Sequence, residues 1–202
     1  MTIKDKLAHY EPKPLGEKGR YAVLLPLIYD VKTDKYRILY QVRSENISQP
    51  GEVSFPGGRV EEGETFKEAA IRETCEELNL VPDQIDIWGE IDYLIHQGRT
   101  IHCFVGKINV ENWEDIHPNE EVKRLFTVYV DTLLTDEPVY YKVTSTLSDA
   151  KDFPFFLVKN REKYKFGYSE RHIPFYMNLT ENIWGMTAMF THRFTDILKD
   201  SE

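Results

Sequence analysis

The stretch of sequence that decides the fold runs from Gly58 to Leu80 and reads GRVEEGETFKEAAIRETCEELNL. Between Thr65 and Leu78 it contains neither Gly nor Pro and consists largely of good helix formers. Thr65 stands where a helix cap is expected, with Glu68 three residues on, which is the spacing of a capping box. Pro82 follows and is expected to stop the helix.

The two faces of this predicted helix differ in character. At about 100° per residue, one face carries side chains suited to packing; they are Ile71, Thr74, Cys75 and Leu78. The opposite face carries Glu73, Glu76 and Glu77. Like charges at this spacing repel one another, so three stacked carboxylates indicate a bound cation. Oxygen ligands without His or Cys suit Mg²⁺ or Mn²⁺, although a merely solvated acidic face is the alternative for these three residues alone.

The wider spacing resembles the signature of the Nudix hydrolase family. The pattern G-x5-E-x7-R-E-x-x-E-E, which arises by chance about once in 10⁵ chains of this size, is matched by Gly58, Glu64, Arg72, Glu73, Glu76 and Glu77. Two positions depart from the family pattern. Thr74 stands where a bulky aliphatic is usual, and Asn79 stands where Gly is usual; Asn tolerates the left-handed conformation expected at a helix end.

The resemblance implies an enzyme that cuts the pyrophosphate of a nucleoside diphosphate derivative with a divalent metal ion, Mg²⁺ or Mn²⁺. It assigns metal binding to Glu73 and Glu77, with Glu76 and the Gly57 carbonyl assisting. It assigns Glu64 and Arg72 to bracing the loop and the helix beside the catalytic carboxylates.

The general base is left open by the sequence. Glu76 and Glu77 are candidates within the signature. A third is Glu121 in the segment Asn119–Val122, which resembles the loop acid of many Nudix hydrolases. For Glu121 the alternative interpretation is a solvated loop side chain.

Segments outside the signature resemble the coenzyme A diphosphatase branch of the family; they are Tyr21–Leu27, Tyr40–Ser44, Gly51–Gly58 and Ile183–Ala188. The implied reaction hydrolyses coenzyme A or its thioesters to 3′,5′-ADP and 4′-phosphopantetheine or its acyl form. Arg43 and Gly58 are the predicted substrate-binding residues, a solvated strand-end Arg43 being the alternative. The basic residue that this branch usually has between its Arg-Ser and its Gly-x-x-x-F is missing, and Ser48 is nearest to its place.

Two other functions are kept as alternatives. The first is a Nudix hydrolase of ADP-ribose or another nucleoside diphosphate derivative. The second is a nucleotide-sensing Nudix module without catalysis, which is disfavoured because all four glutamates of the signature are present.

The rest of the chain predicts an α/β (α+β) Nudix fold, with a mixed β-sheet sandwiched between α-helices. One domain is expected over residues 1–202, with an N-terminal extension over 1–19, the Nudix signature over 57–80 and an amphipathic C-terminal helix over 180–199. Predicted strands cover 21–29, 36–43, 86–95, 100–110 and 125–130, and several short ones are expected within 138–176. Trp184 and Phe190 are expected in the core rather than as a substrate platform, and Cys75 as a small buried side chain.

Composition limits the partners. With 25 Lys and Arg against 34 Asp and Glu, the 202-residue chain carries a net charge of −9, which argues against coating nucleic acid or anionic membranes. A small-molecule nucleotide diphosphate is therefore the expected partner, with no nucleic acid and no membrane. The absence of an apolar leader and of cysteine pairs predicts a cytoplasmic protein. A homodimer through the aromatic-rich residues 138–176 is a further expectation.

Overall fold

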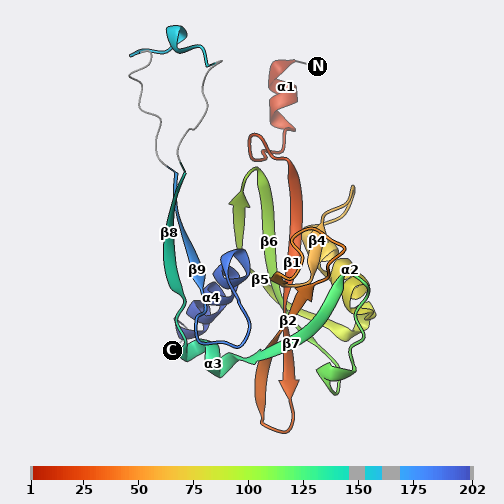
Figure 1. Cartoon of the computed structure of the whole chain (residues 1–202). Helices are drawn as coiled ribbons and strands as arrows, with labels where there is room; N and C mark the ends of the chain where they lie inside the picture. The colour runs from red at the N-terminus through yellow and green to blue at the C-terminus, as the bar shows by residue number, and fades with distance from the viewer. Residues whose placement is uncertain (1, 146–152, 161–168, 201–202) are drawn as a thin grey trace.

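The computed structural model describes residues 2–145, 153–160 and 169–200, and Figure 1 shows the whole chain. Within these residues the main sheet has seven strands; they are β1 (Gly19–Asp30), β2 (Lys35–Arg43), β3 (Val53–Ser54), β4 (Gly57–Arg59), β5 (Ile85–His96), β6 (Arg99–Ile108) and β7 (Val122–Tyr129). The main path runs β3-β2-β1-β6-β5, with β4 paired to β1 and β7 paired to β2. β1 and β6 are parallel and the other pairs are antiparallel, so the predicted mixed sheet is confirmed.

The described residues form four helices; the last three lie on the two faces of this sheet, and the first lies beyond the start of β1 (Figure 1). They are α1 (Ile3–Ala8), α2 (Phe66–Leu78), α3 (Val130–Thr135) and α4 (Gly185–Lys199), with 3-10 turns η1 (Pro82–Gln84), η2 (Trp113–Asp115) and η3 (Phe155–Leu157). A separate ribbon of β8 (Val139–Ser145) and β9 (Ser169–Phe175) extends away from the main sheet. Of the helices in the described part of the chain, none has the length and apolar character needed to span a membrane.

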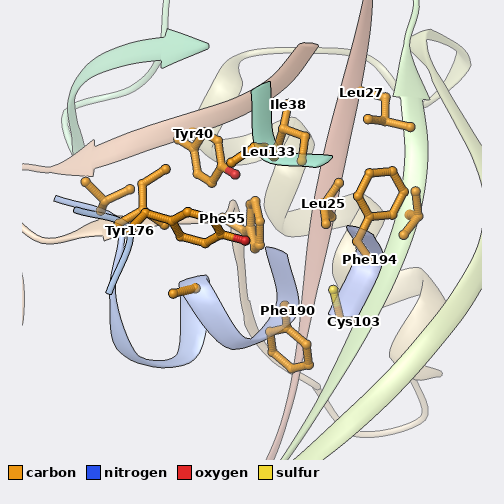
Figure 2. Close-up of a cluster of buried hydrophobic side chains, with 14 of the residues drawn as sticks. Leu25, Leu27, Ile38, Tyr40, Phe55, Cys103, Leu133, Tyr176, Phe190 and Phe194 are labelled. Atoms are coloured by element: carbon orange, nitrogen blue, oxygen red, sulfur yellow. The ribbon is translucent and has the colours of Figure 1, made fainter. Parts of the chain in front are cut away.

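The alternation of side chains along each strand divides the core between the two faces. On β1, Leu25 and Leu27 point toward α4, where they join Phe190 and Phe194 in the larger cluster shown in Figure 2. Leu24, which precedes Leu25, points to the other face. This cluster fixes α3 and α4 against one face of the sheet and leaves the opposite face to α2.

The face toward α2 carries two smaller clusters. Ala70 packs with Ala22 and Leu24 of β1, and Leu78 packs with Leu39 of β2. Because buried contacts hold both ends of α2, the helix has a fixed position over the strands around Gly57, the first residue of β4.

The C-terminal helix is shorter than predicted, because α4 begins at Gly185 and not at residue 180. Ile183 is fully buried, but it lies before the helix in a segment without regular secondary structure, and its carbonyl accepts a hydrogen bond from the Tyr176 N–H. The apolar stripe therefore continues past the start of the helix into a segment that packs on the same core. Phe190 is in the core as expected, whereas Trp184 is 37% exposed and stacks on Phe175 with ring centroids 5.3 Å apart.

Two further boundaries differ from expectation. The predicted strand 125–130 begins earlier, at Val122, and Val130 already belongs to α3. Of the short strands predicted within residues 138–176, the structure describes β8 and β9. Residues 153–160 contain η3 and no strand, and the rest of that prediction falls on residues outside the described ranges.

Candidate functional site

Helix α2 carries most of the predicted site, and its ends have clear local causes. At the start, the Thr65 hydroxyl accepts the Glu68 N–H at 3.2 Å while the Glu68 carboxylate accepts the Thr65 N–H at 2.8 Å, so the predicted capping box is confirmed. At the other end, Asn79 adopts the left-handed conformation with φ 51° and ψ 45°. The helix therefore ends at Leu78, the limit that the sequence predicts, and Asn79 ends it before Pro82 is reached.

Gly57 and Gly58 begin the short strand β4, which lies between β1 and α2. Gly57 has φ 150°, and a Cβ there would lie 2.3 Å from the Ala22 carbonyl oxygen. At Gly58, a Cβ would lie 2.3 Å from the carboxyl carbon of Glu73. Only glycines allow the backbone to approach both β1 and the Glu73 carboxylate this closely.

Glu77 is the most buried carboxylate of the predicted site, with 4% of its surface exposed. Its Oε2 accepts two hydrogen bonds of 3.0 Å each, one from Gln41 Nε2 and one from the Gly57 N–H. Burial raises the pKa of Glu77 from its usual 4.5 to about 7, and the charges of Glu73 and Glu121 act in the same direction, against the two hydrogen bonds. This carboxylate is therefore costly to hold ionised without a nearby cation.

Arg72 links the other carboxylates of the signature. Its guanidinium binds both oxygens of Glu64, at 2.9 and 3.1 Å, and donates to the Arg59 carbonyl at 2.9 Å. The same group reaches Glu73 at 2.9 Å and Glu76 at 3.4 Å. These hydrogen bonds lower the pKa of Glu64, whereas burial raises the pKa of Glu73 despite Arg72. Arg72 thus contacts three of the carboxylates of the signature, and its role in orienting them stays a prediction.

The loop that carries Glu121 is tied to the C-terminal turn of α2. The Asn119 N–H donates to the Glu77 carbonyl at 2.8 Å, and Asn119 Nδ2 donates to the Glu76 carbonyl at 3.0 Å. Asn119 Oδ1 in turn accepts the Glu121 N–H at 2.9 Å. The Glu121 side chain is exposed, and its charge contributes to raising the pKa of both Glu73 and Glu77. The loop acid is therefore near enough for its charge to act on two carboxylates of the helix.

Arg43 lies at the end of β2, where it pairs with Val122 and is therefore close in space to this loop. Its Nε donates to the Ser48 carbonyl at 2.8 Å and its Nη2 to the Ser48 hydroxyl at 3.3 Å. The next residue, Ser44, donates its N–H to the Glu121 carbonyl at 2.9 Å. Among the described residues Arg43 forms no ion pair, so its charge is not neutralised by a carboxylate.

The predicted metal ligands are carboxylates, which suit a hard divalent ion, but their side chains do not all point toward one position. No three acidic, His or Cys side chains within the described residues lie together as a ready metal site. Glu73 and Glu76 point toward Arg72, and the Glu76 side chain is 57% exposed and can rotate. The buried Glu77, the Glu73 carboxylate against Gly58 and the hard oxygen donors fit a divalent ion once Glu76 turns.

Cys75 differs from expectation, since it is half-buried rather than enclosed. Burial still raises the pKa of its thiol. With Ile71 it lines an open hollow of about 620 Å³ on the outer flank of α2, which Arg72 and Glu76 also border. The packing face of α2 is instead formed by Ala69, Ala70, Thr74, Glu77 and Leu78.

Two residues that contact the predicted site were not predicted from the sequence. Gln41 binds the Glu77 carboxylate, and Asn119 links α2 to the loop of Glu121. A glutamine at an inward-facing strand position was a detectable signal for the first, because Leu39 and Gln41 share one face of β2. For Asn119, the sequence predicts no role beyond its place in the segment that contains Glu121. Its role at the helix end depends on a contact between distant parts of the chain.

Comparison with known proteins places this fold and site in a family. The family model of the NUDIX domain matches residues 19–147. The chain therefore belongs to the Nudix hydrolase family, whose members are pyrophosphohydrolases that use divalent metal ions.

Individual relatives agree with this assignment. The chain is 30% identical over 182 residues to Nudix hydrolase 3 of Caenorhabditis elegans, an alignment covering 88% of this chain and 72% of the relative. It is 32% identical over 160 residues to the peroxisomal coenzyme A diphosphatase NUDT7 of Mus musculus, covering 75% and 66%. A MutT/nudix family protein from Enterococcus faecalis superimposes with a TM-score of 0.53 over 98% of this chain and 70% of that one; at 12% identity this shows the fold alone.

Proposed function

We propose that this enzyme hydrolyses the pyrophosphate of coenzyme A or its thioesters, with release of 3′,5′-ADP and 4′-phosphopantetheine or its acyl form. One observation supports the reaction type: the buried carboxylate of Glu77 lies beside Glu73 and the Gly57–Gly58 segment of β4. The substrate is supported by the segments that resemble the coenzyme A branch and by the mouse relative, which is named a coenzyme A diphosphatase.

In this proposal Glu73 and Glu77 hold the metal ion, Mg²⁺ or Mn²⁺, with Glu76 and the Gly57 carbonyl completing its oxygen ligands. When bound, the ion supplies positive charge to the phosphate oxygens and lowers the pKa of a coordinated water. Because the net charge of the protein is −9, this cation offsets the repulsion between an acidic protein and an anionic substrate.

The remaining residues bind, orient and move a proton. Arg43 donates to the substrate phosphate, which its lack of an ion pair within the described residues supports. Gly58, whose backbone lies against the Glu73 carboxylate, is the second substrate-binding residue of the proposal. A water molecule attacks one phosphorus, the anhydride P–O bond breaks, and the water proton passes to Glu121; Glu76 and Glu77 are the alternative bases. Arg72 and Glu64 brace the catalytic helix.

The test is a substrate panel with the full chain and either Mg²⁺ or Mn²⁺. The panel contains coenzyme A, an acyl-coenzyme A, ADP-ribose and a dinucleoside polyphosphate. Coenzyme A or its thioester is expected to have the highest kcat/KM, and Glu77→Gln is expected to abolish its turnover. Equal turnover of ADP-ribose would favour the broader nucleoside diphosphate hydrolase, and tight nucleotide binding without turnover would favour a sensor.

Location and assembly stay predictions. A cytoplasmic location is predicted from the sequence, whereas the mouse relative is named as peroxisomal. The expected dimer surface includes β8, whose Val139, Tyr141 and Val143 are 45 to 49% exposed and lie on one face of the ribbon. Sedimentation of the full chain would measure the oligomeric state.

A further inference from the structure

Gln41 occupies a position where the fold calls for an apolar side chain. Successive residues of β2 alternate between the two faces of the sheet. Tyr40 and Val42 belong to the core beneath α4, whereas Leu39 packs against Leu78 of α2. Gln41 shares the α2 face with Leu39 and is 2% exposed.

The amide of Gln41 is directed at Glu77. Gln41 Nε2 donates to Glu77 Oε2 at 3.0 Å and also to the Ser54 hydroxyl at 3.3 Å. The Gly57 N–H donates to that same Oε2 at 3.0 Å. Two donors from different strands thus fix one oxygen of the carboxylate. Among the described residues, none donates a hydrogen bond to the other oxygen, Oε1.

Packing gives no reason for a glutamine here. The buried Oε1 atom of Gln41 has no hydrogen-bond partner among the described residues, and an unpaired buried amide oxygen lowers stability. Methionine has nearly the same length and would fill the position without this cost. The glutamine is therefore explained by its contact with Glu77 rather than by the core.

We propose that Gln41 is a positioning residue that, with the Gly57 amide, holds Oε2 of Glu77 and thereby presents Oε1 to the metal ion. This inference rests on the proposed role of Glu77 as a metal ligand. The hydrogen bond fixes both the orientation of the carboxylate plane and the atom left free, as partners behind a metal ligand generally do. Without it, Glu77 can rotate about the Gly57 contact alone.

Direct Mn²⁺ binding tests this role without any substrate. Electron paramagnetic resonance would measure the Mn²⁺ affinity of the full chain and of Gln41→Met, Glu77→Gln, their double variant and Ser54→Ala. We expect Gln41→Met to weaken Mn²⁺ binding about 10- to 100-fold. Ser54→Ala, which removes only the second partner of the Gln41 amide, is expected to stay within about twofold of the parent protein. In the Glu77→Gln background, Gln41→Met is expected to cause no further loss.

The outcomes separate this inference from the proposal on which it rests. If Glu77→Gln weakens Mn²⁺ binding but Gln41→Met does not, the positioning role is overturned and the metal site stands. An equal loss from Gln41→Met with and without the Glu77 carboxylate would also overturn it. If Glu77→Gln leaves Mn²⁺ binding unchanged, both proposals fail. Metal-free thermal unfolding would verify that each variant folds, and Gln41→Ala replaces Gln41→Met if the latter does not.

Discussion

Replacing Glu77 by Gln should stabilise the metal-free protein above neutral pH, even though it removes a proposed metal ligand. The carboxylate is buried, and its pKa is raised from 4.5 to about 7. Folded protein therefore holds this proton more tightly than unfolded protein does. Between about pH 4.5 and about pH 7, the free energy of unfolding falls as pH rises, and above about pH 7 the full destabilisation is present.

The size of the effect follows from the same shift. A pKa rise from 4.5 to about 7 corresponds to about 3 kcal/mol at pH values above both. Glutamine at position 77 carries no charge, and its carbonyl oxygen can still accept from Gln41 and Gly57. The variant is therefore expected to gain up to about 3 kcal/mol near pH 8. For a chain of this length that is a rise in Tm of roughly 5 to 10 °C.

Thermal unfolding with a chelator, followed by circular dichroism from about pH 5 to about pH 8, measures this gain. Added Mg²⁺ or Mn²⁺ should reverse the order, since only the parent protein is stabilised by binding the ion. Glu76→Gln is the matched control, because that side chain is exposed and should show no comparable gain. The reasoning is refuted if metal-free Glu77→Gln is no more stable than the parent near pH 8, or if both lose stability equally with rising pH.

Three further perturbations test neighbouring parts of the site. Gly58→Ala places a Cβ on the Glu73 carboxylate and should lower both Mn²⁺ affinity and kcat at least about 10-fold, with little change in far-UV circular dichroism; unchanged affinity would contradict the close approach. Asn119→Ala releases the Glu121 loop from α2 and should lower kcat about 10-fold in the parent but not in a Glu121→Gln background; equal losses in both would mean that Asn119 acts only on stability. A chelator should abolish hydrolysis, and Mg²⁺ should restore it; activity that survives chelation would exclude the metal-dependent reaction.

Much of the fold could be predicted because its signals are local. The apolar runs that became β1 and β2 lie within a residue or two of their predicted limits. Thr65 and Asn79 mark the two ends of α2 by side-chain and backbone chemistry that a short window contains. The start of α4 could not be predicted, because Ile183 shares a buried stripe with helical residues although it lies outside the helix.

The contacts of the candidate site could likewise be predicted only where they are local in sequence. The Arg72 network could be anticipated, since Glu64 and Arg72 lie on one short segment and meet as their spacing suggests. The contacts of Gln41 with Glu77 and of Asn119 with Glu76 join residues 36 and 43 positions apart. Sequence periodicity does not reveal contacts between residues this far apart, so only the three-dimensional structure shows them.

The anchoring of the loop at Asn119 also bears on how this chain tolerates change in length. Glu121 takes its place from the end of α2, through backbone and side-chain bonds to Glu76 and Glu77, and not from the strands between them in the chain. The hairpin of β5 and β6 can therefore gain or lose residues at its tip without displacing the acid. Helix and loop thus form one unit whose geometry does not depend on the length of the hairpin tip.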